Sequence, residues 1–123
     1  MWIFSETGFV SAVLDRKDDS RFVVRGRDSE SLMPLADYAV TDVVSGGGTD
    51  YPFRVFVDRI VFLGWLSGQV GAIDYTNYKS RMYETRGEQF VEALHDVWED
   101  MQAISPMVDA GRMFRQHLDL GEL

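Results

Sequence analysis

The sequence contains no cysteine and only two histidines among its 123 residues. The absence of cysteine excludes disulfide bonds, cysteine-ligated zinc or iron–sulfur centres, and catalysis by a thiol. It also fits a reducing compartment, and we expect a cytoplasmic protein. The two histidines, His95 and His117, lie in different segments without a nucleophile motif beside them. The sequence therefore offers no support for a hydrolase of the Ser-His type.

Long apolar runs are also missing. The longest, at residues 60–66, is interrupted by Gly64, and it is far shorter than the roughly 20 residues that cross a bilayer. Residues 1–6 begin without a basic segment and soon become acidic, unlike a secretory signal. We therefore expect neither a membrane span nor a membrane partner.

Basic residues are scarce relative to acidic ones. There are 12 Lys and Arg against 20 Asp and Glu, which gives a formal net charge of -8. This charge disfavours broad attraction to a nucleic-acid backbone, so direct nucleic-acid binding is not expected, although small basic patches remain compatible with it. With 46% hydrophobic residues, a chain of this length can bury the core of one domain.

Short apolar runs between turn residues predict a sheet in the first half of the chain. We expect strands at residues 2–4, 9–14, 21–27, 39–44 and 52–57. The first two form a hairpin, and a glycine-rich loop at residues 45–50 joins the last two. A short helix after Asp28 or Ser29 would separate the third strand from the fourth, with Pro34 in its first turns.

Beyond Asp58 the spacing of apolar residues changes from two to about 3.6, which predicts helices. We expect them at residues 59–73, 75–84 and 88–104, and Ser105 with Pro106 ends the last one. Residues 1–104 would then form a single domain. The remaining residues, 105–123, are expected to form a C-terminal arm or a short docked helix.

The order of these elements predicts an α+β fold in which an antiparallel sheet packs against helices. Residues 21–73 follow a β-α-β-β-α order that is compatible with a ferredoxin-like sheet, and the N-terminal hairpin precedes it. No strand follows the second helix of that segment. An N-terminal strand would therefore have to take the remaining place in the sheet.

Arginines on the expected strands form the first candidate site. Arg21, Arg25 and Arg27 alternate along one strand and so share a face, and Arg54 can join them. Guanidinium groups match the geometry of phosphate and carboxylate, whereas ion pairs with nearby acidic residues would make the same arginines structural. The candidate ligand-binding residues are Arg21, Arg25, Arg27, Arg54, Tyr75, Tyr78 and Lys79.

Two further patterns resemble ligand sites without matching them. Asp15, Asp18 and Asp19 lie close together in sequence but lack the alternating ligands, central glycine and terminal glutamate of a calcium loop. The glycines at residues 46–48 lack the lysine of a phosphate-binding loop. We expect a solvated turn and a hairpin loop, with no metal and no cofactor.

Apolar and acidic helical surfaces point to a protein partner. Apolar residues surround most of the helix at 59–73, and Gly64 and Gly68 would allow close approach of a second chain or of a neighbouring helix of the same chain. Acidic residues recur at four-residue spacing on the last helix, which fits a basic partner or a solvated face. The candidate interface residues are Phe62, Trp65, Leu66, Glu92, Asp96, Met113 and Phe114.

Several segments together resemble a family of small uncharacterised proteins from bacteria and their phages. These segments are MWIF followed by GF, then VRGR, GGGTDYPFR, DYTNYK and LHDVW. The resemblance covers about residues 1–101 and excludes the tail. It implies no activity, cofactor or catalytic residue.

Taken together, these patterns favour a non-enzymatic cytoplasmic interaction or regulatory module. Its partner would be another protein, with a homodimer as one form of the interaction and modulation of a host by a phage-linked protein as another. One alternative is a small enzyme or ligand-binding domain for a phosphate-bearing compound, which would use the arginine face with Tyr75, Tyr78 and Lys79. A second alternative is an acidic mimic of nucleic acid.

Overall fold

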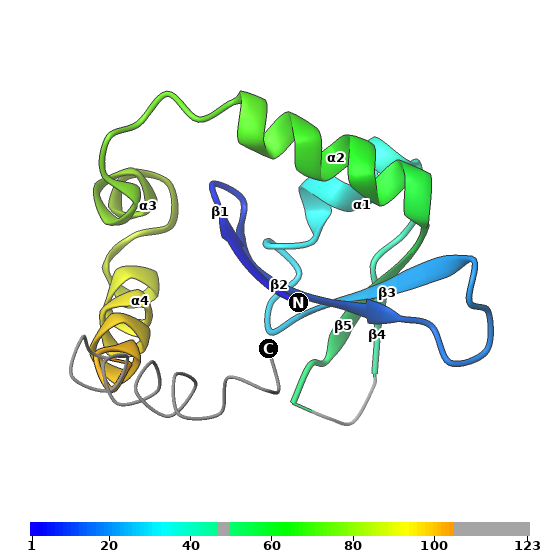
Figure 1. The fold of residues 1–123 in the computed structure, drawn as a ribbon, viewed down its shortest axis with the longest axis horizontal. Helices are drawn as coiled ribbons and strands as arrows, with labels where there is room; N and C mark the ends of the chain where they lie inside the picture. Colours follow the sequence, from blue (N-terminus) through cyan, green and yellow to red (C-terminus); the bar gives the residue numbers. More distant parts are fainter. Residues whose placement is uncertain (47–49, 105–123) are drawn as a thin grey trace, which may run out of the picture. The chain divides into compact units, whose positions relative to one another are not determined.

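Alternating apolar residues in the first half of the chain form a five-stranded antiparallel sheet, followed by helices (Figure 1). This arrangement is seen in a computed structural model that describes residues 1–46 and 50–104. The strands are β1 (Trp2–Ser5), β2 (Gly8–Leu14), β3 (Arg21–Gly26), β4 (Val44–Ser45) and β5 (Phe53–Asp58). The helices are α1 (Met33–Ala39), α2 (Arg59–Gly71), α3 (Tyr78–Arg86) and α4 (Glu88–Met101).

The strands lie in the order β1-β2-β3-β5-β4, and every neighbouring pair is antiparallel. The predicted α+β class is therefore confirmed. The N-terminal strand β2 pairs with β3 and takes the place beside it that no later strand fills. The strand β4 lies parallel to β3 with β5 between them, which is the arrangement expected of the β-α-β-β-α segment.

The strand predicted at residues 39–44 is wrong in its position. Ala39 is the last residue of α1, and the strand β4 contains only Val44 and Ser45. The helix ends because Val40 adopts a left-handed conformation, with a φ of 54°, and its N–H bonds back to the carbonyls of Ala36 and Asp37. A helix end therefore occupies part of a run whose composition favours a strand.

The chain divides into two compact units, Met1–Arg81 and Met82–Leu123, with the boundary inside α3. The sheet, α1 and α2 belong to the first unit, and α4 belongs to the second. The single domain expected at residues 1–104 stays a prediction.

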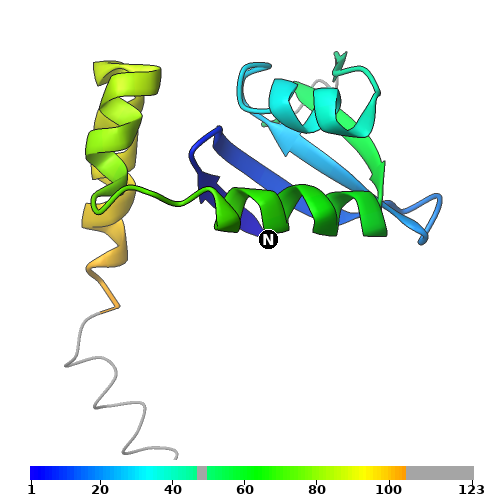
Figure 2. The same ribbon diagram turned by 90° about the horizontal axis from the view of Figure 1, so that it is seen from above.

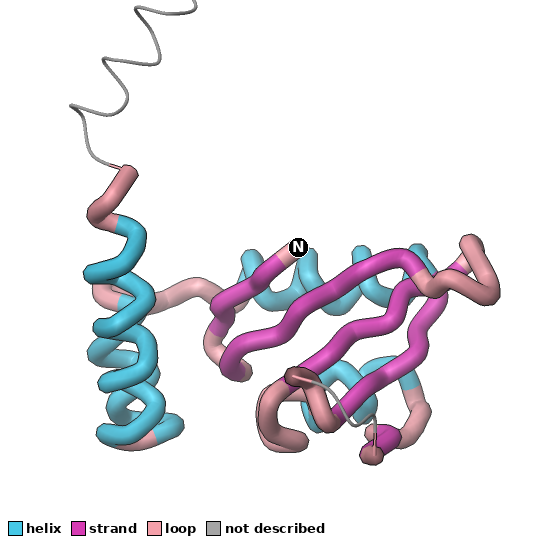
Figure 3. Tube along the Cα trace, turned by 90° about the horizontal axis from the view of Figure 1, so that it is seen from below, coloured by secondary structure: helices cyan, strands magenta, loops and turns pink. Residues whose placement is uncertain are grey.

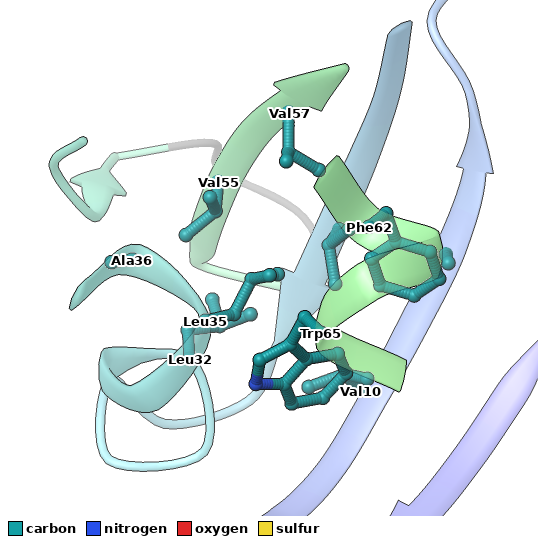
Figure 4. Packing of buried hydrophobic residues seen from close by; sticks show 10 residues of the cluster. Val10, Leu32, Leu35, Ala36, Val55, Val57, Phe62 and Trp65 are labelled. Atoms are coloured by element: carbon teal, nitrogen blue, oxygen red, sulfur yellow. The ribbon is translucent and has the colours of Figure 1, made fainter. Parts of the chain in front are cut away.

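The hydrophobic core of the first unit lies between one face of the sheet and the helices α1 and α2 (Figure 4). It consists of Val10, Ala12, Val24, Leu32, Leu35, Ala36, Val55, Val57, Phe62 and Trp65. The ring of Phe62 lies 5.6 Å from those of both Phe22 and Trp65, measured between centroids. Burial of these large side chains supplies most of the driving force for folding.

Two residues expected at a protein interface belong to this core. Phe62 and Trp65 are each only 3% exposed, and Leu66 is partly buried against the same cluster. The interface prediction for Phe62 and Trp65 is therefore wrong. The spacing of apolar residues along a helix is the same whether they pack on the sheet of their own chain or on another chain. Here the sheet of the same chain covers these side chains.

The glycine at position 64 also serves contacts within the chain. A Cβ atom there would clash with the hydroxyl of Tyr38 on α1, whereas nothing lies within 4 Å of one built at Gly68. Of the two explanations for the close approach at Gly64, packing against a neighbouring helix of the same chain is correct.

The opposite side of the sheet has neither α1 nor α2 packed on it. The two helices lie in front of the strands when the molecule is seen from above (Figure 2), and behind the strands when it is seen from below (Figure 3). Strand residues that alternate with the core positions point to this side. We call it the open face, and it carries Trp2, Phe4, Phe9, Ser11, Val23, Arg25, Arg54 and Phe56.

We predict that Val40→Gly stabilises the protein. A β-branched residue in the left-handed region costs about 1–2 kcal/mol, and glycine removes that strain while increasing the entropy of the unfolded chain. We expect a net gain of about 1 kcal/mol in the free energy of unfolding, measured by thermal and urea unfolding. Val70→Gly, at an exposed position inside α2, is the matched control and should lower stability by about 0.5 kcal/mol, the difference between the helix propensities of valine and glycine. A lower melting temperature for Val40→Gly would contradict the prediction.

Candidate functional site

One row of residues crosses the open face from β1 to β5. Its members are paired by register: Trp2 with Ser11, Ser11 with Arg25, and Arg25 with Arg54. Since neighbouring strands lie about 4.8 Å apart, the whole row spans about 14 Å between its outer Cα atoms. Two arginines that lie directly opposite each other on adjacent strands repel. The row therefore concentrates positive charge at one place in an acidic protein.

The guanidinium group of Arg25 is held between two neighbours. Its Nη2 atom donates a hydrogen bond of 2.8 Å to Ser11 Oγ, and Ser11 is only 1% exposed. On its other side, the Cζ atom of Arg25 lies 4.6 Å from the centroid of the Tyr51 ring. Its Nε atom is buried without a hydrogen-bond partner. Arg25 is thus held by a hydrogen bond and a ring contact, and one of its donors is buried without a partner.

A second guanidinium group approaches the same ring. The Cζ atom of Arg27 lies 5.4 Å from the centroid of Tyr51, a distance typical of a cation–π interaction. Within residues 1–46 and 50–104, neither Arg25 nor Arg27 forms an ion pair with a carboxylate. The two arginines therefore share an aromatic ring, not an acidic partner.

Arg21 behaves differently, although it shares a strand and a face with Arg25. Its Nε atom donates to Asp15 Oδ2 at 2.5 Å, and its guanidinium group lies over the ring of Phe56. Pairing with an acidic residue therefore accounts for Arg21, whereas Arg25 and Arg27 pair with no carboxylate among the described residues. The predicted arginine set separates into one structural residue and a cluster of Arg25, Arg27 and Arg54.

The acidic residues of the turn after β2 organise the turn itself. Asp15 accepts the backbone N–H of Lys17 and the Nε–H of Arg21, and these two hydrogen bonds lower the pKa of its carboxyl group. Asp18 accepts from the hydroxyl and the N–H of Ser20, which likewise lowers the pKa of Asp18. In the part of the chain that the structure describes, no group of three or more metal-ligating side chains gathers.

The predicted tyrosines lie at a different place, beside the turn between β1 and β2. The hydroxyl of Tyr78 donates to the carbonyl of Ser5 at 2.9 Å. Arg81 bridges Glu6 and Asp74, at 2.5 and 2.7 Å, and its guanidinium group lies 5.2 Å from the ring centroid of Tyr75. Lys79 lies in the first turn of α3. These contacts tie the chain after α2 to the hairpin, so we assign Tyr75 and Tyr78 a structural role.

An aromatic cluster adjoins the arginines and was not among the predicted site residues. The rings of Phe4 and Phe9 stack with centroids 4.6 Å apart, and Trp2 meets Phe9 at 5.7 Å and 85°. Phe9 in turn lies 6.4 Å from Tyr51. Strand alternation places Trp2 and Phe4 on one face of β1 and Phe9 and Ser11 on one face of β2, and the register of the sheet, which only the structure gives, brings both pairs onto the arginine face.

The comparisons with known proteins do not identify the chain. Protein-family models, curated proteins and solved structures give no match. The resemblance to small bacterial and phage proteins therefore stays a prediction. Among the helices of residues 1–46 and 50–104, none has the length and apolar character to span a membrane.

We predict that Asp15→Asn destabilises the protein near neutral pH and that this difference disappears in acid. The pKa of Asp15 is lowered in the folded state, so its ionised form stabilises the fold above the ordinary value of 3.8. That contribution is lost as the pH falls through the lowered value. Urea unfolding at pH 7 and at successively more acidic pH measures the effect. Asp19→Asn, at an exposed position in the same turn, is the control, and equal stability of Asp15→Asn and wild type at pH 7 would contradict the prediction.

Proposed function

We propose that the open face binds a phosphate-bearing compound through Arg25, Arg27 and Arg54. The observation that carries the proposal is the shared use of the Tyr51 ring by Arg25 and Arg27, with no carboxylate paired to either among the described residues. Arg54 lies opposite Arg25 and adds a third cation. We assign binding, and no reaction, to this face.

Phosphate suits this cluster better than a single carboxylate does. A phosphate group presents three strong acceptor oxygens and close to two negative charges, so it can accept from more than one guanidinium group at once. The Nε atom of Arg25 is buried, so an anion would accept from the Nη N–H groups that Ser11 does not use.

The neighbours of Arg25 act as positioning residues in this proposal. Ser11 holds the guanidinium group from the β2 side by a hydrogen bond, and Tyr51 supports its flat face. A side chain that is already ordered loses less entropy when the ligand binds. The net charge of -8 weakens long-range attraction of an anion, so affinity must come from direct contacts at the arginines.

We predict that wild-type protein binds inorganic pyrophosphate and ribose 5-phosphate and that Arg25→Ala weakens both by about tenfold or more. The estimate follows from about 1.5–3 kcal/mol for a hydrogen bond to a charged group. Isothermal titration calorimetry measures the affinity, and far-UV circular dichroism checks that the variant folds. Arg25→Lys keeps the charge without the planar fork and should give an intermediate affinity.

Arg16→Ala is the matched control, since Arg16 is exposed in the turn after β2 and takes no part in the cluster. It should bind both compounds as wild type does. The proposal fails if neither compound binds wild-type protein, or if Arg25→Ala binds them with unchanged affinity.

A second candidate function concerns α4 in the other unit. Its apolar residues recur at spacings of three and four, yet only Leu94 among them is buried, while Trp98 is 52% and Met101 57% exposed. Acidic residues adjoin this stripe, including the exposed Glu92 and Asp96. We propose that it binds a basic amphipathic helix of another protein, because its apolar residues and its charge are both complementary to one. A second copy of α4 would bring like charges together, and Met113 and Phe114 lie outside the described residues.

We predict that α4 binds a synthetic Lys/Leu amphipathic helix. Trp98→Ala should weaken binding about tenfold because apolar contact is lost. The double variant Glu92→Lys with Asp96→Lys should also weaken it about tenfold, because charge pairing is lost. Fluorescence anisotropy of the labelled peptide measures this, with a Glu/Leu peptide of the same pattern as control. Equal binding of the acidic peptide contradicts the proposal. If Trp98→Ala leaves binding unchanged and only the charge reversals weaken it, the apolar contact is excluded and the nucleic-acid mimic is favoured instead.

A further inference from the structure

The open face offers rings as well as charges to a ligand. Phe9 is the central ring of a series, since it contacts the rings of Phe4, Tyr51 and Trp2. Through Phe9 the series connects the exposed indole of Trp2 to the Tyr51 ring, over which Arg25 and Arg27 lie. A flat apolar group and an anionic group of one ligand can therefore be held on the same surface.

Trp2 is the member of this series that a ligand can reach most readily. Its residue is 67% exposed, although tryptophan is highly buried on average in folded proteins. The angle of 85° to Phe9 means that the two rings do not cover each other by stacking. The indole can therefore offer surface to another flat ring, and stacking of a nucleic-acid base on an aromatic side chain is favourable for every base.

The register sets the distance between the ring and the charge. Trp2 and Arg25 are separated by a single residue of the row, Ser11, which corresponds to about 10 Å between their Cα atoms. The side chain of Arg25 reaches toward Ser11, and so toward β1, because it donates its hydrogen bond there. A base joined to its phosphate through one sugar fits this arrangement.

We infer that the ligand of the open face is a nucleotide unit, with its base stacked on Trp2 and its phosphate bound by Arg25 and Arg27. This inference rests on the proposed function and names the class of compound that the phosphate belongs to. The same unit occurs in a free mononucleotide and in a single-stranded nucleic acid. Ring stacking does not distinguish the bases, so binding is expected to tolerate different bases.

The test compares AMP with ribose 5-phosphate, which keeps the sugar and the phosphate but lacks the base. Wild-type protein is expected to bind AMP about tenfold more tightly than ribose 5-phosphate, measured by calorimetry. Trp2→Ala should reduce the affinity for AMP to that for ribose 5-phosphate and leave the latter unchanged. Trp2→Phe keeps a ring and should retain part of the difference. Trp98→Ala, which removes an exposed tryptophan from the other unit, is the matched control and should behave as wild type.

The outcomes separate this inference from the proposed function. Equal affinities of wild-type protein for AMP and ribose 5-phosphate overturn the nucleotide assignment and leave phosphate binding intact. An unchanged preference for AMP in a folded Trp2→Ala variant also overturns the assignment of the base to Trp2. If neither compound binds, both proposals fail. Should Trp2→Ala unfold, Trp2→Phe and quenching of tryptophan fluorescence by AMP decide the matter, and an absence of quenching in wild-type protein counts against stacking.

A short oligoadenylate distinguishes the two sources of the nucleotide unit. If a single strand is the ligand, the oligonucleotide binds more tightly than AMP, and its affinity falls more steeply with salt because several phosphates are neutralised. If a mononucleotide is the ligand, the affinities per site are equal and the salt dependence is the same. Both results support the nucleotide unit, and failure of AMP and the oligonucleotide alike to exceed ribose 5-phosphate overturns it.

Discussion

The helices α1 and α2 pack on the same face of the sheet, and the character of the other face depends on this one-sided covering. Successive strand residues point to opposite sides, so a valine that joins the core directs its neighbour to the open face. Val24 is fully buried beneath the helices, and Arg25 therefore points away from them. Burial of one face of each strand therefore determines which residues lie on the open face.

The open face departs from what stability alone would favour. Arg25 and Arg54 oppose each other across β3 and β5, where opposite charges or apolar pairs would be more favourable. A tryptophan is left exposed on the edge strand β1. The core on the other face carries one departure of its own, because Trp65 Nε1 is buried there without a hydrogen-bond partner.

Part of the candidate site was accessible from the sequence, because it depends on local geometry. The shared face of Arg21, Arg25 and Arg27 follows from strand alternation alone. The separation of Arg21 from the other two does not, since it depends on Asp15 turning back onto it after β2. Tyr51 likewise lies in a segment without regular periodicity, and its place beside Arg25 arises only when β5 pairs with β3.

The sequence by itself determined the α+β class, most of the strands and helices, and the need for an N-terminal strand beside β3, because these follow from repeats of two and 3.6 residues and from the chain order of the elements. Only the tertiary structure decided that Phe62 and Trp65 face their own sheet, and that Tyr78 bonds to Ser5 across 73 positions of sequence. The spacing of apolar residues shows which side of a helix is apolar. It carries no information about which surface covers that side, since this depends on how all the elements pack together.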